Sequence, residues 1–393
     1  MNPLFADLTT TIFEEMSALA REHDALNLGQ GFPDGTGPED ILLRASDALL
    51  RGSNQYPPMR GLLELRKAVT AHYARHQDLH LDLEEVVVTS GATEALAASL
   101  LALLAPGDEV VLIQPMYDAY LPLVLLAGAR PRHVTLTPPE WLLTEAALEA
   151  AVTPASRVLV LNNPLNPAAR VFTQEELEAV AHVCRRHDLI AVCDEVWEHV
   201  VFDDRRHVPL MSLPGMRDRT VKIGSAGKMF SLTGWKVGFA CASPALIEPI
   251  ARAHQFLTFT TPPNLQSAVA YGLSRPPAAF REMSDAYGRS RDRLTAALRA
   301  DGWAALQSEG TYFTCIDLRA SGVEETDRDF VHRSVVDFGV AAIPLSSFYA
   351  HQPADGIVRL CFAKSDDVLD EAARRLGAAR RAASTTPARK SSS

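Results

Sequence analysis

The sequence predicts an α/β protein in which a mixed, mostly parallel sheet lies between layers of helices. First, strands at 85–89, 109–113 and 132–135 alternate with helical segments at 94–104 and 119–126. Such alternation is typical of parallel sheets, because each crossover helix returns the chain to the same end of the sheet. Second, Val158–Leu161 is an unbroken apolar run, typical of a strand buried on both faces.

The remaining elements follow from hydrophobic periodicity and from glycine and proline punctuation. Helical patterns cover 8–22, 38–51, 62–77, 175–187, 276–301 and 327–338. Strand patterns cover 189–193, 238–242, 314–318 and 356–364. With 393 residues and 47% hydrophobic composition, the chain is long enough for two domains.

Composition excludes several functional classes. A net charge of −10 argues against nucleic acid as a partner. The apolar runs 96–105 and 121–129 are too short to cross a membrane, and residues 1–15 show no signal peptide. The five cysteines have no Cys-x-x-Cys spacing, which predicts reduced thiols in a cytoplasmic protein.

His72 and His76 stand four residues apart on one predicted helix, a spacing that can hold zinc. No His-Glu-x-x-His pattern and no third ligand accompany them. We therefore expect exposed helical histidines and no metal.

The chemistry is concentrated in the segment 221–238, where an apolar run enters a turn of serine and glycine. Three of the six lysines of the chain lie there: Lys222, Lys228 and Lys236. A buried lysine can lose its charge and act as a nucleophile, which arginine cannot do. A phosphate-binding Walker loop would need glycine at position 222 and serine or threonine at 229, which hold Lys222 and Met229. A Ser-x-x-Lys hydrolase would need Ser-Asp-Asn and Lys-Thr-Gly motifs, which the chain lacks.

The spacing Ser225-x-x-Lys228-x-Phe-x-x-x-Gly-x-Lys236-x-Gly resembles the lysine motif of class I/II aminotransferases, pyridoxal-phosphate enzymes of fold type I. The methionine/kynurenine/glutamine aminotransferase group is the most similar. The resemblance extends from Thr10 to Leu376. It implies that Lys228 forms a Schiff base with the cofactor and that Ser225 and Lys236 hold its phosphate. Lys236 stands where many relatives have arginine.

The same resemblance implies a domain division. We expect an N-terminal segment, 1–40, that joins a small domain, and a large cofactor domain at 41–280. The small C-terminal domain should cover 281–380, and 381–393 should be a disordered tail rich in serine, threonine and alanine.

Further cofactor contacts are expected where strands end. The turn Gly91-Ala92-Thr93 precedes a helix, whose free N–H groups favour a phosphate. Asp194 ends an apolar strand, where a carboxylate is costly unless it meets a cation. The resemblance implies that this cation is the protonated pyridine nitrogen of the cofactor. It also implies that Tyr117 stacks on the pyridine ring and that Asn166 bonds the ring oxygen.

Two positions depart from the family pattern. Trp197 replaces the tyrosine that follows the acid by three residues, so the phenol contact to the ring oxygen is lost or replaced by an indole N–H. Ala168-Ala169 replaces the usual Thr-Gly, so an alanine must reach any backbone conformation that glycine permits.

Substrate contacts are assigned from both ends of the chain. Arg359 lies inside an apolar strand and needs a carboxylate, which the α-carboxylate of a substrate can supply. A pair with an internal acid remains open. The resemblance implies that Gly31 lies beside that carboxylate, that Ile12 and Phe13 form the pocket wall, and that Phe259 and Thr260 reach the active site of a dimer partner. Tyr56 is expected to reach the partner's cofactor phosphate.

The sequence thus predicts a homodimeric aminotransferase that moves an amino group from an L-amino acid to a 2-oxo acid in a pyridoxal/pyridoxamine phosphate ping-pong cycle. Residues 254–262 contain no arginine that could hold a second carboxylate, so neutral, sulfur-containing or aromatic donors are favoured over aspartate and glutamate. Two alternatives remain: a β-lyase acting on cysteine conjugates, and a cofactor-binding scaffold without turnover.

Overall fold

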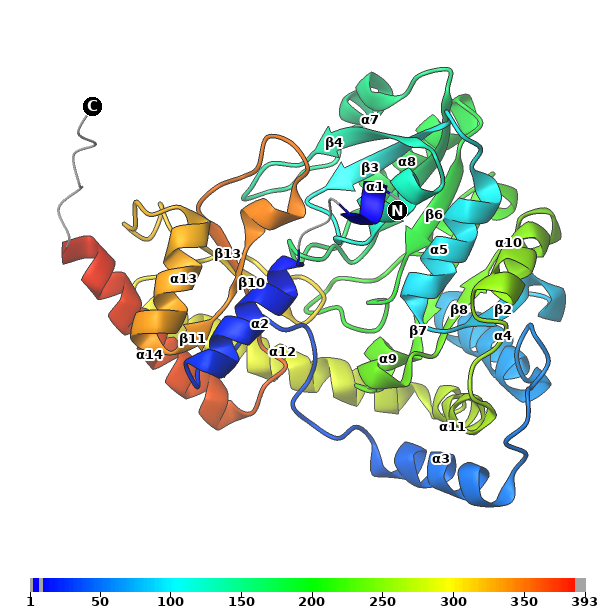
Figure 1. Ribbon diagram of the computed structural model, residues 1–393, viewed down its shortest axis with the longest axis horizontal. Coiled ribbons are helices and arrows are strands. Elements are labelled where there is room, and N and C mark those ends of the chain that lie inside the picture. Colours follow the sequence, from blue (N-terminus) through cyan, green and yellow to red (C-terminus); the bar gives the residue numbers. More distant parts are fainter. Residues whose placement is uncertain (1–2, 7–9, 386–393) are drawn as a thin grey trace.

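A seven-stranded sheet forms the centre of the larger part of the protein. The computed structural model describes residues 3–6 and 10–385. The strand order is β2-β8-β7-β6-β5-β3-β4, and only β8 runs antiparallel to its neighbours (Figure 1). The bounds are β2 Val86–Thr89, β3 Glu109–Gln114, β4 Arg130–Thr135, β5 Ser156–Asn162, β6 Ile190–Asp194, β7 Thr220–Ser225 and β8 Gly238–Cys241. The mixed, mostly parallel sheet predicted from the sequence is confirmed.

Helices cover both faces of this sheet, as the buried run in β5 predicts. Val158 and Val160 pack with α5, α6 and α10, whereas Leu159 and Leu161 pack into the core on the opposite face. The bounds are α3 Glu39–Arg51, α4 Leu63–Gln77, α5 Ala92–Leu103, α6 Tyr120–Leu126, α7 Glu145–Ala151, α8 Gln174–Arg186, α9 Ala226–Met229, α10 Pro244–Leu257 and α11 Pro263–Leu273. Alternate side chains of one strand therefore belong to two cores, because a pleated strand points successive residues to opposite faces.

The smaller part combines both ends of the chain. Its sheet has the order β12-β13-β10-β9, and β1 pairs in parallel with β11 beside it. Figure 1 shows the N-terminal helix α2 next to α13, so segments far apart in sequence lie side by side. The bounds are α2 Ile12–Glu22, β1 Leu26–Asn27, α12 Pro277–Ala300, β9 Ala304–Ala305, β10 Phe313–Asp317, α13 Asp327–Phe338, β11 Val340–Ala341, β12 Ile343–Pro344, β13 Ile357–Cys361 and α14 Asp366–Thr385. The short helix α1, Pro3–Ala6, instead contacts α6 of the larger part.

The structure corrects two expectations. Helix α14 continues through Thr385, past residue 381 where a disordered tail was expected, and residues 386–393 lie outside the described part of the chain. His72 is fully buried instead of exposed, because α4 turns this face toward His199 and Phe280. Within the described residues, no helix is long and apolar enough to span a membrane.

Candidate functional site

The site is a cavity of 480 Å³ at the carboxyl edge of the large sheet. Parallel strands end at this edge together, and the turns that follow them carry the polar side chains. The sequence-predicted residues that line the cavity are Phe13, Gly31, Gly91, Ala92, Thr93, Tyr117, Asn166, Asp194, Trp197, Ser225, Lys228, Lys236 and Arg359. Its volume lies within the range of small-molecule sites, about 300–1,000 Å³.

One end of the cavity is arranged for a dianion. Gly91, with φ of 79°, is the N-cap residue that directly precedes helix α5. Lys236 approaches this turn so closely that a Cβ on Gly91 would lie 3.2 Å from the Lys236 Nζ. A Cβ on Gly238 would lie 2.6 Å from the Gly91 carbonyl carbon, so glycine is needed at both positions. The helix N-terminus, the Lys236 ammonium and the nearby Ser225 hydroxyl form a site that can hold a phosphate.

The floor of the cavity carries an acid that lacks a counter-ion. Asp194 is buried at the end of β6, and its Oδ2 accepts a hydrogen bond of 2.6 Å from the Tyr120 hydroxyl. Among the described residues, no basic side chain forms an ion pair with Asp194. Burial raises the pKa of Asp194 above the usual range of a carboxyl. A cation placed above this carboxylate would remove the cost of burying it.

Arg359 and Asn166 lie on the substrate side of the cavity. Arg359 is 1% exposed, and its two terminal nitrogens donate to the Asn166 Oδ1 and to the Gly29 carbonyl, both at 2.8 Å. Its buried Nε has no hydrogen-bond partner, and no described carboxylate forms an ion pair with it. The pair with an internal acid that the sequence left open is therefore absent from the described part of the chain. Burial lowers the pKa of Arg359 to about 10.

The contact with Arg359 also orients Asn166. Its backbone N–H donates to the Asn162 Oδ1 at 2.8 Å, and its side-chain oxygen is used by Arg359. The amide NH₂ is then the end left to donate a hydrogen bond to a ligand. A ligand oxygen and a ligand carboxylate can thus be bound by two side chains that position each other.

Lys228 lies between these groups, with an amine in a protein environment that disfavours its charge. Burial lowers the pKa of Lys228 to about 8, so a substantial neutral fraction exists near pH 7.5. Its Nζ lies 3.0 Å from the Tyr312 hydroxyl and 4.7 Å from the centre of the Trp197 ring. A neutral amine can act as a nucleophile and as a base.

Both departures from the family pattern are structurally accommodated. Ala169 adopts a φ of 59°, the left-handed conformation expected where glycine is usual. Its carbonyl accepts hydrogen bonds from the backbone N–H groups of Glu309, at 2.7 Å, and Gly310, at 3.1 Å. Trp197 is buried and stands edge-on to the Tyr312 ring, with centroids 4.3 Å apart.

Four predicted residues do not line the cavity of this chain. Ile12 packs against the core of the smaller part. Tyr56 is 83% exposed and contacts Phe259, whose ring centre is 5.5 Å away. Together with Thr260 they lie at a surface groove formed by 54–57 and 260–264.

Sequence reasoning missed Tyr120, Tyr312 and Phe313. Tyr120 belongs to the segment that contains Tyr117, but only the start of α6 there turns its hydroxyl toward Asp194. The ring of Phe313 lies 3.9 Å below the Arg359 guanidinium. A signal was available in Gly310-Thr311-Tyr312-Phe313, a glycine turn with two aromatic residues that leads directly into a strand.

Comparison with known proteins decides the family. Residues 23–376 match the family model described as aminotransferase class I and II. The chain belongs to the class I and II aminotransferases. A probable N-succinyldiaminopimelate aminotransferase of Mycobacterium tuberculosis is 45% identical, over 93% of this chain and 95% of the relative. A methionine aminotransferase of Escherichia coli is 38% identical, over 94% and 96%.

Solved structures agree with this membership. The structure of N-succinyldiaminopimelate aminotransferase from Mycobacterium tuberculosis superposes with a TM-score of 0.92 at 45% identity, covering 96% of this chain and 99% of that one. The fold is that of fold-type-I aminotransferases, and the chain is a pyridoxal-phosphate-dependent transferase. The cavity fits this cofactor chemically, because it offers a dianion site at one end and an unpaired buried carboxylate beneath its centre.

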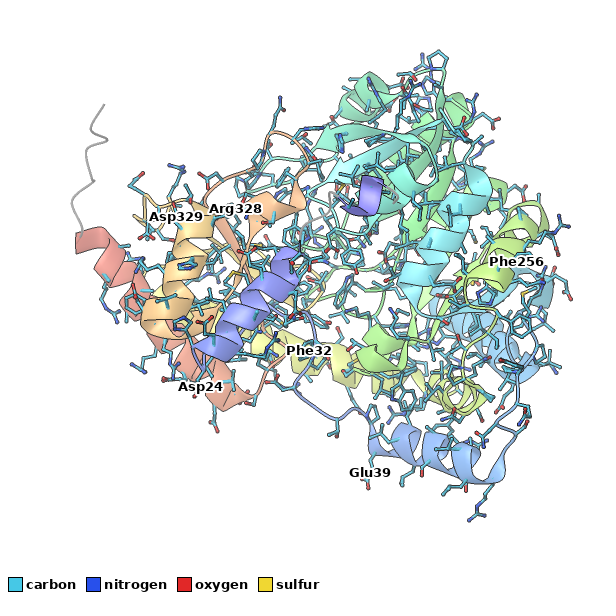
Figure 2. All side chains as sticks on the ribbon, in the orientation of Figure 1. Asp24, Phe32, Glu39, Phe256, Arg328 and Asp329 are labelled. Carbon is cyan, nitrogen blue, oxygen red and sulfur yellow. The ribbon has the colours of Figure 1, made fainter. Side chains whose placement is uncertain are left out.

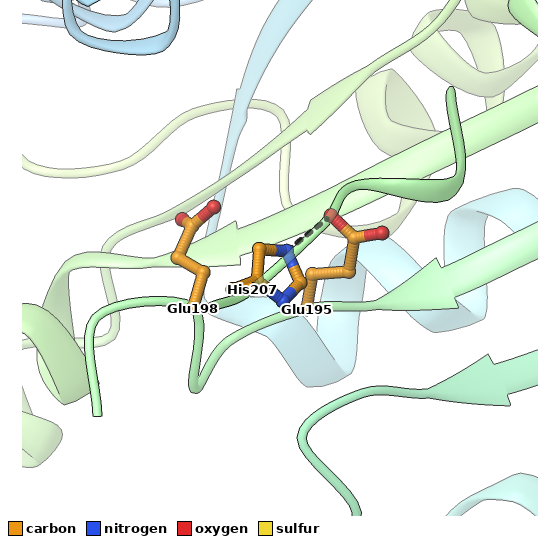
Figure 3. A group of neighbouring side chains, drawn as sticks. All are labelled: Glu195, Glu198 and His207. Carbon is orange, nitrogen blue, oxygen red and sulfur yellow. Dashed lines mark hydrogen bonds and ion pairs between the residues drawn. The ribbon is translucent and has the colours of Figure 1, made fainter. Parts of the chain in front are cut away.

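A second group of charges is buried behind the acid. Figure 3 shows Glu195, Glu198 and His207, whose donor atoms lie within 4.8 Å of one another, close enough to hold a metal ion. The Lys222 ammonium already bonds both carboxylates, Glu198 Oε2 at 2.7 Å and Glu195. An internal cation therefore fills the position that a metal would take.

Proposed function

We propose that this protein transfers the amino group of a neutral, sulfur-containing or aromatic L-amino acid to a 2-oxo acid in a ping-pong cycle. The observation that carries the proposal is the juxtaposition of the Lys228 amine, with its pKa of about 8, and the Arg359 guanidinium, which has no carboxylate partner among the described residues. This pair suits an α-amino acid, because the Lys228 amine can exchange a proton and the Arg359 guanidinium has no carboxylate partner among the described residues. Its carboxylate binds Arg359, and its Cα–H then lies within reach of Lys228.

Each residue has a role that follows from its contacts. Ser225, Lys236 and the N–H groups of 91–93 would hold the phosphate of the cofactor, and Lys228 is the amine to which the cofactor would be attached. Asp194 would pair with the ring nitrogen and keep it protonated, and the Asn166 NH₂ would be available to donate to the ring oxygen. When bound, pyridoxal phosphate supplies an electron sink for the electrons released at Cα.

Arg359 and Lys228 act on the substrate itself. Arg359 binds the α-carboxylate with two N–H groups and thereby orients the Cα–H bond. The Lys228 amine, when it is free, would take the proton from Cα and deliver it to the carbon two bonds away, on the other side of the amino nitrogen, within the same site. Phe13 and Phe313 contribute an apolar wall.

The donor class rests on the charge of the lining. Arg359 is the one arginine among the described residues that line the cavity, so a second carboxylate on the substrate finds no guanidinium in this chain. This supports methionine-like or aromatic donors, in line with the methionine aminotransferase relative. The 45% identity with a probable N-succinyldiaminopimelate aminotransferase supports a second candidate donor, N-succinyl-diaminopimelate. The additional carboxylates of this donor would have to bind beyond the lining of the cavity, in which Arg359 is the one arginine among the described residues.

The visible absorption of the purified holoenzyme tests the proposal. Methionine, glutamine, phenylalanine, kynurenine, aspartate, alanine and N-succinyl-diaminopimelate are added singly, without an oxo acid. Loss of the cofactor's visible band with one equivalent of oxo acid formed identifies the donor. A band that no amino acid changes would refute transamination. Pyruvate formed together with a released leaving group would instead indicate β-elimination.

Lys228→Ala is the matching variant. It should abolish turnover, and ordinary turnover by this variant would contradict the role of Lys228. Lys67→Ala serves as control, because Lys67 is exposed on α4, away from the cavity.

We further propose a homodimer with shared active sites. Support comes from large apolar residues that are exposed at the groove and on the helix that precedes it. Tyr56 is 83% exposed in the groove, and Phe256 is 85% exposed at the end of α10 (Figure 2). Such exposed patches are typical of interfaces. Light scattering should give twice the chain mass, and Tyr56→Phe should weaken cofactor retention without dissociating the dimer.

A cytoplasmic location stays a prediction, supported by five buried free thiols.

A further inference from the structure

The free amine of Lys228 has one well-defined hydrogen-bond partner. The Tyr312 hydroxyl lies 3.0 Å from its Nζ, and the Gly31 carbonyl lies further away, at 3.4 Å. The Tyr312 hydroxyl also donates its own hydrogen to the Gly31 carbonyl. Since that hydrogen is already used, the phenol can offer Lys228 only a lone pair, and Lys228 must donate. A directed chain thus runs from the lysine through the phenol to the backbone of the loop 29–31.

Two backbone hydrogen bonds and the packing of the ring hold Tyr312 in place, so its hydroxyl has little freedom to move. The N–H of Thr311 donates to the Val200 carbonyl at 2.8 Å, and the Tyr312 carbonyl accepts from the Phe362 N–H at 3.0 Å. The ring is 1% exposed and packs against Trp197 and Phe313. Burial raises the pKa of Tyr312 well above 10, so the phenol keeps its hydrogen under all working conditions.

The substitution at Trp197 makes this phenol more important. An indole N–H donates and cannot accept, so Trp197 offers the Lys228 amine its ring face and no lone pair. Two buried side chains also donate hydrogen bonds to the backbone of the loop 29–31. Arg359 binds the Gly29 carbonyl at 2.8 Å, and Tyr312 binds the Gly31 carbonyl. Arg359 contacts this loop directly and Lys228 contacts it through Tyr312, so both residues that act on the substrate are connected to one short segment.

We propose that Tyr312 is a positioning residue that holds the Lys228 amine whenever the lysine is not joined to the cofactor, and that links its position to the loop 29–31 and through it to Arg359. This inference rests on the proposed function for its kinetic consequence only. The hydrogen bond is a property of the chain and can be measured without turnover.

The first measurement follows the ionisation of Lys228 in the holoenzyme loaded with pyridoxamine phosphate, in which the lysine is free. Acetic anhydride labels the amine at a series of pH values, and mass spectrometry of the Lys228 peptide gives its pKa. The Tyr312 oxygen accepts a hydrogen bond from the Lys228 ammonium and so favours the charged form of the lysine. Tyr312→Phe removes this acceptor and should therefore lower the pKa of Lys228 by about one unit. An unchanged pKa would overturn the proposal.

The second measurement separates positioning from packing. In the half-reaction with the best donor, Tyr312→Phe should lower the maximal rate about tenfold and change the half-saturating amino acid concentration less than about twofold, because one proton-transfer geometry is lost and Arg359 is retained. Tyr287→Phe is the matched control: its ring lies 5.8 Å from that of Tyr312, but its hydroxyl bonds Ser231 at 2.7 Å. Equal effects of the two variants on rate and pKa would assign Tyr312 a structural role. If no amino acid reacted in the half-reaction, the proposed function would be refuted. The labelling experiment would then test by itself whether Tyr312 positions the Lys228 amine.

Discussion

Replacing Lys222 with methionine should destabilise the protein strongly, because it leaves two buried carboxylates without their cation. The exposed fractions are 0% for Lys222, 1% for Glu195 and 4% for Glu198. Methionine fills most of the volume of the lysine side chain, so the change is mainly electrostatic. Breaking a buried ion pair by removing one partner costs about 3–5 kcal/mol. His207, 3.2 Å from Glu195, stays in place and keeps one polar contact to this carboxylate, which places the expectation at the lower end, about 3 kcal/mol.

The pH dependence of the loss follows from the direction of the pKa shifts. Burial alone would raise the pKa of Glu195, but Lys222 and His207 hold it at about 2, below its usual value of 4.5. In the native protein this carboxylate therefore stabilises the fold above pH 4.5, and the contribution is lost only as the pH falls toward 2. Without Lys222, burial dominates and the pKa rises above 4.5. The variant then regains stability as the pH is lowered from 7.5 toward 5, because the folded state takes up protons.

Urea unfolding of the holoenzyme, followed by circular dichroism at pH 7.5 and 5.5, measures the effect. Lys222→Met should lose about 3 kcal/mol at pH 7.5 and less at pH 5.5. Lys67→Met, on the exposed face of α4, should stay within about 0.5 kcal/mol of the native protein. The triple variant with Glu195→Gln and Glu198→Gln should recover much of the loss. A loss below about 1 kcal/mol at pH 7.5, or one that is the same at both pH values, would refute the electrostatic reasoning.

Three further predictions concern the cavity. Ala169→Gly should raise the free energy of unfolding by about 0.5–1 kcal/mol, because the φ of 59° strains alanine and not glycine; no gain in urea unfolding would contradict this. Arg359→Met should raise the half-saturating donor concentration about 100-fold, because the donor's carboxylate would lose two charge-assisted hydrogen bonds to the guanidinium, and a change below tenfold in the stopped-flow half-reaction would count against the role of Arg359. Tyr120→Phe removes the 2.6 Å hydrogen bond to Asp194 and should weaken cofactor retention about tenfold on dilution, whereas retention equal to that of the native protein would show that this bond is dispensable.

Most of the fold and many residues of the cavity could be predicted from the sequence, because both depend on local patterns at strand ends. Asp194 and Asn162 end neighbouring strands in register, so a strand-by-strand interpretation places their polar turns at one edge. The family, the fold class and the cofactor predicted from the lysine motif are confirmed. Domain limits and the roles of single residues stay predictions. The left-handed backbone of Ala169 was expected because a glycine position had been lost.

Contacts between distant segments could not be predicted in the same way. Tyr312 and Lys228 are 84 positions apart, and nothing in either local pattern indicates that the phenol meets the amine. The pairing of Lys222 with Glu195 and Glu198 likewise depends on how β7 packs beside the turn after β6. His72 looked like an exposed helical residue, and only the packing of α4 against His199 buried it. Periodicity and motifs reveal which residue types stand at strand ends. Partner choice and pKa require the three-dimensional packing, because burial and distance set the strength of every electrostatic interaction.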